Sequence, residues 1–124
     1  MAITVTAPGV AIPSGRGDAF IANGVSADAS ACEILKAAPG AGKSILVHHL
    51  TINNGANALS HTIGEGEAVA GTLDTNLIGP IAMPANSSIQ WDFYPPMKLT
   101  ANTLLAIDSS GAGAVCVFVE GEIQ

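Results

Sequence analysis

Three histidines, His48, His49 and His61, are the residues of this chain best suited to binding a metal ion. His48 and His49 are adjacent in an apolar run that favours a strand, so we expect their side chains to point to opposite faces. If Asn54-Gly55 forms a two-residue hairpin turn, His48 lies beside His61 on the returning strand, whereas a four-residue loop places His48 opposite Ile63. Two imidazoles leave a zinc ion two ligands short. We therefore expect neutral, hydrogen-bonded histidines and no metal site.

Two cysteines and one acidic cluster are the next candidates for metal binding or nucleophilic chemistry. Cys32 and Cys116 are too few for a disulfide framework, and Cys116 fits a small buried hydrophobe within a strand. Glu65, Glu67 and Asp74 lie in a stretch rich in Gly and Ala whose spacing matches no known calcium loop. We expect a solvated surface loop over Glu65–Asp74 that binds no cation.

The sequence evidence for a group of catalytic residues is equally weak. Serine, cysteine, histidine and acidic residues are all present, but no local signature of a catalytic nucleophile accompanies them. The ten acidic residues are scattered and do not define the carboxylate pair that glycoside hydrolysis needs. The sequence therefore predicts no catalytic residue, no cofactor and no enzyme activity.

The segment Gly40-Ala41-Gly42-Lys43-Ser44 resembles the end of a phosphate-binding loop. The full motif needs a glycine where this chain has Ala37, and it needs a helix after the loop. Here the segment leads into an apolar strand, so we expect a glycine-rich loop between strands and no nucleotide site. The integrin-binding tripeptide Arg16-Gly17-Asp18 is short enough to arise by chance.

The aromatic residues Trp91, Phe93 and Tyr94 lie close together in the sequence and could stack on a sugar ring. Trp91 and Phe93 share a strand face with Ile89, which favours the core. Tyr94, just before two prolines, is the better candidate for an exposed aromatic.

Charge excludes several classes of partner. The 124 residues carry a formal net charge of -6, with only four basic residues, Arg16, Lys36, Lys43 and Lys98. These do not cluster, so we expect no binding to nucleic acid or to an anionic membrane. Charged residues make up 11% of the chain, against about 25% in ordinary globular proteins. A surface so poor in charge is expected to be covered by partner molecules.

The N-terminus, Met1-Ala2-Ile3-Thr4-Val5, has neither the basic region nor the apolar run of a signal peptide. No run of the sequence approaches the roughly 20 apolar residues of a membrane-spanning helix. We therefore expect a protein that is made in the cytoplasm and is soluble unless assembled.

The last strand is the clearest of the elements expected to position these residues. Val115, Val117, Val119 and Ile123 alternate with a second set on the opposite face, namely Cys116, Phe118, Glu120 and Glu122. This alternation predicts a strand with one buried face, ordered inside a sheet.

Prolines and glycines divide the rest of the chain into short runs rich in Val, Ile, Leu and Thr, which is typical of a sandwich or barrel. Over Ala27–Lys36 a strand is favoured over a helix. The other predicted strands are 19–22, 45–52, 58–64, 77–81, 88–93 and 104–107. Pro80 predicts an edge strand or bend, and Tyr94-Pro95-Pro96 predicts a break in the sheet. The expected fold is an all-β, antiparallel, jelly-roll-like β-sandwich of about eight strands.

Residues 1–30 differ from the rest, because Pro and Gly divide them into short pieces. We expect them to form an extended N-terminal arm or edge segment, preceding a single sandwich domain over 31–124. An arm that packs on a neighbouring subunit and an edge strand of the same domain both fit this stretch.

Several short sequence segments resemble those of the small β-rich virion proteins of tailed bacteriophages, over roughly residues 30–124. They are Ala37-Ala38-Pro39-Gly40-Ala41-Gly42-Lys43-Ser44-Ile45-Leu46-Val47, Leu50-Thr51-Ile52-Asn53-Asn54-Gly55, Leu99, Asn102-Thr103-Leu104-Leu105, Ala112-Gly113-Ala114-Val115 and Gly121. The resemblance implies a jelly-roll-like homotrimer on the virion. Its partners would be copies of itself and the major capsid protein or another virion protein. It carries over no catalytic residue.

Among such proteins many are capsid decoration (cement) proteins, which is the function we expect here. A tail or head-fibre component and a carbohydrate-binding module are the alternatives. We expect residues 1–30 and the loop Glu65–Asp74 to make the contacts with partners.

Overall fold

The computed structural model describes residues 4–6, 18–26, 32–69 and 71–124. The described residues form strands and connecting turns and contain no helix, which confirms the all-β prediction. The strands are β1 (Thr4–Thr6), β2 (Asp18–Ser26), β3 (Glu33–Lys36), β4 (Ile45–Asn54), β5 (Leu59–Val69), β6 (Thr72–Met83), β7 (Ser88–Lys98), β8 (Leu105–Ser109) and β9 (Val115–Ile123).

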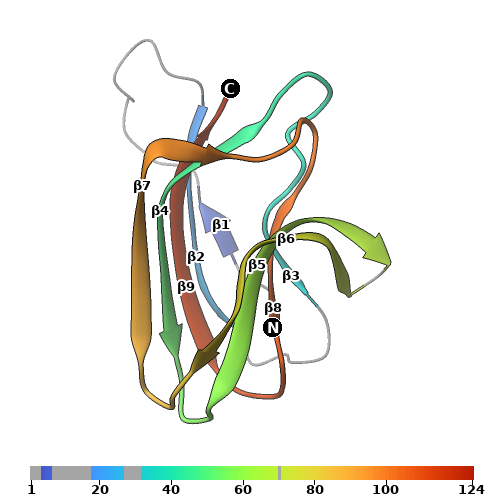
Figure 1. The fold of residues 1–124 in the computed structure, drawn as a ribbon. Helices are drawn as coiled ribbons and strands as arrows, with labels where there is room; N and C mark the ends of the chain where they lie inside the picture. The colour runs from blue at the N-terminus through green and yellow to red at the C-terminus, as the bar shows by residue number, and fades with distance from the viewer. Residues whose placement is uncertain (1–3, 7–17, 27–31, 70) are drawn as a thin grey trace.

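The strands form two sheets, in the orders β1-β2-β9-β4-β7 and β3-β8-β5-β6 (Figure 1). Every neighbouring pair is antiparallel. Strands consecutive in the chain mostly lie in different sheets, and the eight strands β2 to β9 fill two four-stranded layers in the order of two interleaved Greek keys. This arrangement is the jelly roll, so the predicted fold is confirmed.

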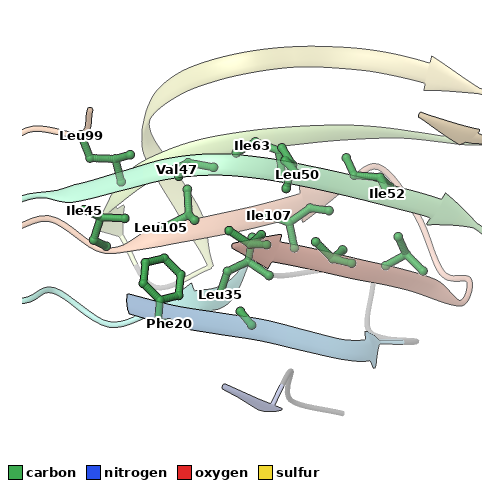
Figure 2. Packing of buried hydrophobic residues seen from close by; sticks show 14 of the residues in the cluster. Phe20, Leu35, Ile45, Val47, Leu50, Ile52, Ile63, Leu99, Leu105 and Ile107 are labelled. Atoms are coloured by element: carbon green, nitrogen blue, oxygen red, sulfur yellow. The ribbon is translucent and has the colours of Figure 1, made fainter. Parts of the chain in front are cut away.

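The core lies between the two sheets and is mainly aliphatic, with the ring of Phe20 packed among the Leu, Ile and Val side chains (Figure 2). The predicted inward residues of β9, Val115, Val117 and Val119, are at most 2% exposed. In the ladder with β4, Val119 lies opposite Leu50, Val117 opposite Ile52 and Val115 opposite Asn54. Each such side chain contributes about 1.5–3 kcal/mol when it is fully removed from water. The alternation read from the sequence therefore places the main stabilising contacts correctly.

Part of the predicted arm is an inner strand. β2 pairs with β9 along its whole length, from Asp18 opposite Ile123 to Ser26 opposite Val115, and β1 pairs with the other side of β2. Asp18–Ser26 therefore belongs to the sandwich, although it precedes residue 31, where the sandwich domain was predicted to begin. Residues 1–3, 7–17 and 27–31 lie outside the described residues. Within Ala27–Lys36, the described β3 is a strand, as predicted.

The predicted hairpin at Asn54-Gly55 is wrong. β4 pairs with β7 and β9, whereas β5 pairs with β6 and β8 in the opposite sheet. Leu50, for example, lies opposite Trp91 and Val119 rather than Leu59. The reason is that the backbone of Asn54-Gly55 is already paired, because the Asn54 N–H donates to Ser87 (2.7 Å) and the Gly55 N–H to Ala114 (2.9 Å). The chain therefore crosses from one sheet to the other at this point.

The predicted surface loop Glu65–Asp74 is also wrong, because β5 and β6 continue through it as a long hairpin. Three register shifts along this pair absorb residues that do not fit a regular ladder. Gly66 adopts a φ of 74°, and Leu73 packs against Gly64, where a Cβ would lie 2.8 Å from the Leu73 Cδ1. Glycine thus permits a close approach of the two strands that its usual preference for loops conceals.

The predicted break at Tyr94-Pro95-Pro96 is a bulge within β7 instead. Val47 lies opposite Met97 and His49 opposite Asp92, so the four residues Phe93–Pro96 face His48 alone. β7 is the last strand of its sheet, so one side of its backbone has no neighbouring strand. Prolines are tolerated there because the N–H groups that they lack are not needed for pairing. The same reasoning holds for Pro80, and its predicted place on an edge strand is confirmed, because β6 ends the other sheet.

Candidate functional site

His61 does not pair with His48 but closes a buried polar chain between the sheets. The two hydrogens of the Asn54 Nδ2 are shared among the carbonyl oxygens of Asn57 (2.9 Å), Met83 (3.2 Å) and Pro84 (3.0 Å), which leaves its Oδ1 as an acceptor. The His61 Nε2 must therefore carry the hydrogen of the 3.0 Å bond to Asn54, and its Nδ1 accepts the Ser109 hydroxyl at 2.8 Å. This fixes one neutral tautomer of His61.

Burial lowers the pKa of His61, whose side chain is completely shielded from solvent. The unfolded chain takes up a proton below pH 6.5 while the folded chain resists it. Stability is therefore complete above pH 6.5 and falls as the pH drops, by up to about 1.4 kcal/mol per pH unit. We expect the urea concentration at the midpoint of unfolding to decrease when the pH is lowered from 7.5 to 5.5. The decrease should be smaller in His61→Gln. Equal slopes for the two proteins would contradict the buried neutral imidazole.

His48 and His49 lie on the same outer face of the β2-β9-β4-β7 layer, so the prediction that they point to opposite faces is wrong. The register shift beside His48 leaves two residues between the core positions Val47 and Leu50. The His48 Nε2 lies 3.1 Å from the Glu122 Oε1, and the His49 Nδ1 contacts the Asp92 Oδ1. Each imidazole thus has its own carboxylate partner.

The three acidic residues of the predicted loop have separate environments. Glu65 is 8% exposed, and its carboxylate accepts hydrogen bonds from Thr100 N (2.7 Å), Thr100 Oγ1 (2.7 Å) and Thr103 Oγ1 (3.3 Å). Glu67 accepts the Cys32 thiol at 3.3 Å, and Asp74 lies on β6. Over the described parts of the chain, no group of three or more His, Cys, Asp or Glu is placed to hold a metal ion.

Cys32 and Cys116 are both free thiols. Burial, reinforced by the hydrogen bond to Glu67 and by its charge, raises the pKa of Cys32 to about 11. The Cys32 thiol is therefore protonated at neutral pH and is a poor nucleophile.

The glycine-rich segment Gly40–Ser44 forms a turn that leads into the strand β4, as predicted, rather than into a helix. Beside it lies a cavity of about 290 Å³. Its lining comprises Ala19, Lys36, Ala37, Ala38, Pro39, Lys43 and Ile123. Another cavity, of about 330 Å³, has only uncharged lining residues, namely Ala58, Leu59, Ser60, Ala82, Met83, Pro84 and Ser110. Of the predicted tripeptide, Arg16 and Gly17 lie outside the described residues.

The aromatic cluster divides between the edge of the core and solvent. Ile89, Trp91 and Phe93 share the inward face of β7, as predicted, but they are only partly buried because β7 is an edge strand. Tyr94 is 100% exposed, within the bulge Phe93–Pro96, which confirms its predicted exposure. A proline-stiffened bulge thus presents one aromatic ring entirely to solvent.

The partly buried apolar residues gather on one side of the sandwich. Of the eight that pack against the core in the described structure, seven lie on the two edge strands β6 and β7. The residues Pro84–Ser87 join these strands in a short turn, so both edges border the same side (Figure 1). We call these seven residues the β6–β7 seam: Leu77, Ile78 and Ile81 of β6 with Ile89, Trp91, Phe93 and Met97 of β7.

The seam was not predicted from the sequence, although the absence of charged residues from one long stretch indicates it. Thr75–Trp91 contains none of the 14 charged residues of the chain and spans most of β6, the turn and the start of β7. Alternation predicts which side chains face inward, but it does not reveal that both strands are edges whose inward faces stay partly open.

The chain matches no protein-family model, no curated protein and no solved structure. Among the described residues, no helix is long and apolar enough to cross a membrane.

Proposed function

We propose that this chain is a structural protein of a bacteriophage virion, a capsid decoration (cement) protein that binds the head shell as a trimer and stabilises it. The observation that carries the proposal is the β6–β7 seam, in which seven partly buried apolar residues lie along two edge strands of the jelly roll, five of them within the uncharged stretch Thr75–Trp91 of a chain with 11% charged residues. Such a side is stabilised when another protein surface covers it. The resemblance to small virion proteins names the kind of assembly, which the fold alone does not.

A decoration protein acts by mass action. It binds the assembled shell and not the separate shell subunits, so each bound copy lowers the free energy of the assembled form. The exposed ring of Tyr94 suits such a contact, because its bulge is held in place before binding and little conformational entropy is lost. Tyrosine is also among the residues that contribute most to protein interfaces.

We expect light scattering of the purified chain at micromolar concentration to give a mass near three times 12.4 kDa. We also expect the trimer to bind expanded capsids that lack it and to raise their melting temperature. Deletion of residues 2–15 should abolish shell binding while leaving the circular dichroism of the sandwich unchanged, because only β1 of the described strands is lost. Unchanged shell binding by this truncation would contradict a role for the N-terminal segment.

The other half of the expected contact region needs revision. Glu65–Asp74 is strand rather than loop, and Glu65 is held by Thr100 and Thr103. Only the end of the hairpin, around Gly71, extends beyond the ladder with β8 and projects from the sandwich (Figure 1). We therefore keep this hairpin end, with the N-terminal segment, as the proposed shell contact.

A tail or head-fibre component would share this fold and surface, and labelling the protein within intact particles would distinguish it by position. A carbohydrate-binding module is favoured by one observation, the complete exposure of Tyr94. A glycan array would test it, since sugar binding that is lost in Tyr94→Ala would replace the decoration function.

A further inference from the structure

We propose that the cavity beside the glycine-rich turn Gly40–Ser44 binds a small organic dianion, a dicarboxylate or a phosphate monoester, through the ammonium groups of Lys36 and Lys43. The cavity has a volume of about 290 Å³, close to the lower limit of about 300 Å³ for small-molecule sites in proteins. This site goes beyond the proposed function and does not depend on it, because neither the seam nor an assembly contributes to it.

The lining of the cavity combines positive charge with an apolar wall. Two of its seven lining residues are lysines, and none is acidic. The other five are apolar, namely Ala19, Ala37, Ala38, Pro39 and Ile123. The four basic residues of the chain are scattered in the sequence, but the fold brings two of them to one cavity. Such a lining complements an organic anion, since the ammonium groups attract its charges and the apolar wall contacts its carbon atoms.

Neither of these lysines has a carboxylate partner within the described part of the chain. Both ion pairs found there join a histidine to a carboxylate. Carboxylates are not scarce, because the chain has ten acidic and four basic residues. The cavity therefore retains two uncompensated positive charges, and a bound anion reduces the repulsion between them.

The side chain of Lys36 is restrained before any ligand binds. Its Nζ lies 5.1 Å from the centroid of the Phe20 ring, within the range of a cation–π interaction. Phe20 belongs to the core and is 2% exposed, so its ring has a fixed position. A lysine that is already restrained loses less conformational entropy when an anion binds.

The turn that carries Lys43 is held at both ends. The Gly40 N–H donates to the Asn102 Oδ1 at 2.9 Å, and the Asn102 N–H donates to the Lys43 carbonyl oxygen at 2.8 Å. Ser44 and Gln124 exchange two backbone hydrogen bonds of 2.9 Å, which attach the turn to the C-terminal end of β9 (Figure 1). The fold therefore fixes the backbone of Lys43 beside the cavity.

Charge favours a small dianion over an acidic macromolecule. Two lysines match two negative charges, whereas binding to nucleic acid requires a larger basic patch. The net charge of -6 would repel an extended polyanion along the rest of its length. A small ligand experiences mainly the local field of the two ammonium groups.

Glutarate and methyl phosphate are the probes for this site, and uncharged glutaramide is the control ligand. In two-dimensional NMR at low ionic strength, we expect at least one dianion to shift the amide signals of Ala19, Ala38 and Lys43. The Kd should be on the order of 1 mM. The dianion that binds more tightly identifies the anionic group that the site prefers. Glutaramide should cause no such shifts, and about 0.5 M sodium chloride should weaken the binding by screening.

Lys36→Gln and Lys43→Gln should each raise the Kd about 10-fold, because each removes one charge-assisted contact with the ligand. The matched control is Lys98→Gln, which removes the same charge from β7 but lies outside the cavity lining. We expect the Kd of this control to remain that of the wild type. Lys43→Arg keeps the charge and should keep the binding.

The dispersion of the NMR signals shows whether each variant folds. If Lys36→Gln does not fold, Lys43→Gln provides the test, because Lys43 is exposed. The absence of shifts with both dianions would overturn the site. Equal weakening by Lys43→Gln and Lys98→Gln would also overturn it, since net charge alone would then explain the binding. Neither result would affect the proposed decoration function, which is tested on capsids.

Discussion

Replacing Asn54 by alanine is expected to lower the free energy of unfolding by about 3 kcal/mol, which is a large part of the stability of a domain of this size. Asn54 is 5% exposed, and its side chain is in hydrogen-bond contact with three carbonyl oxygens and with the His61 Nε2. These contacts join the crossing between the sheets to the turn after β6 and to the buried His61. Without the amide, the His61 Nε2–H has no acceptor, and water cannot easily reach it. Urea unfolding followed by circular dichroism measures the loss.

Asn57→Ala is the matched control, because Asn57 is the same residue type three positions along the chain. It is exposed, and its side chain donates one hydrogen bond, to Ala112 at 3.0 Å. We expect a loss of less than about 0.5 kcal/mol for this variant. Similar losses for the two variants would contradict the importance of the buried polar chain.

The strand faces could be predicted from the sequence because the burial of one side chain in two is a local property. Val115, Val117 and Val119 in β9, and Ile89, Trp91 and Phe93 in β7, lie on the predicted faces. In β4 the pattern fails where the ladder does, since one register shift moves His48 and His49 to the same face. A bulge depends on the partner strand, so the sequence of β4 alone does not contain it.

The pairing of strands was harder to predict than their positions. Asn54-Gly55 has the residue types of a tight turn, but its backbone groups are bound by Ser87 and Ala114, which are more than 30 residues away. In a jelly roll most ladders join strands distant in sequence, and a local turn signal competes with them. The candidate site depends on the same non-local choice, because only the final sheet order makes β6 and β7 edges on one side.

The strand faces and the strand order together explain why the seam is partly exposed. Local alternation makes Trp91 face the core, register shifts beside Ile63 let Ile78 do the same, and the sheet order leaves both residues at the margin of the core. Edge strands in soluble proteins carry devices that prevent further pairing, here Pro80 and the bulge Phe93–Pro96. The chain thus blocks sheet extension at both edges while keeping its apolar side chains there.

Replacing Glu65 by alanine is expected to cost about 2–3 kcal/mol, although the sequence places this residue in an acidic stretch like any solvated loop. Its carboxylate holds the segment after β7 against β5 through Thr100 and Thr103, and the neighbouring Gly66 N–H donates to Leu104 at 3.0 Å. Hydrogen bonds to a charged acceptor are among the strongest in proteins. Alanine would leave the Thr100 N–H and the Thr100 hydroxyl without their acceptor, whereas the Thr103 hydroxyl would keep the Thr100 carbonyl oxygen at 2.6 Å. Thermal unfolding of the purified variant measures the cost.

Glu67→Ala is the control for this variant, since Glu67 lies two residues further along the same strand. Its side chain is exposed and accepts only two long bonds, from Cys32 Sγ and from Gly71 N, both at 3.3 Å. We expect a change within about 0.5 kcal/mol for Glu67→Ala. Glu65→Gln, which keeps one acceptor oxygen, should fall between the two. An equal, small effect of all three substitutions would mean that Glu65 is solvated like its neighbour and that Thr100 and Thr103 are held by the backbone alone.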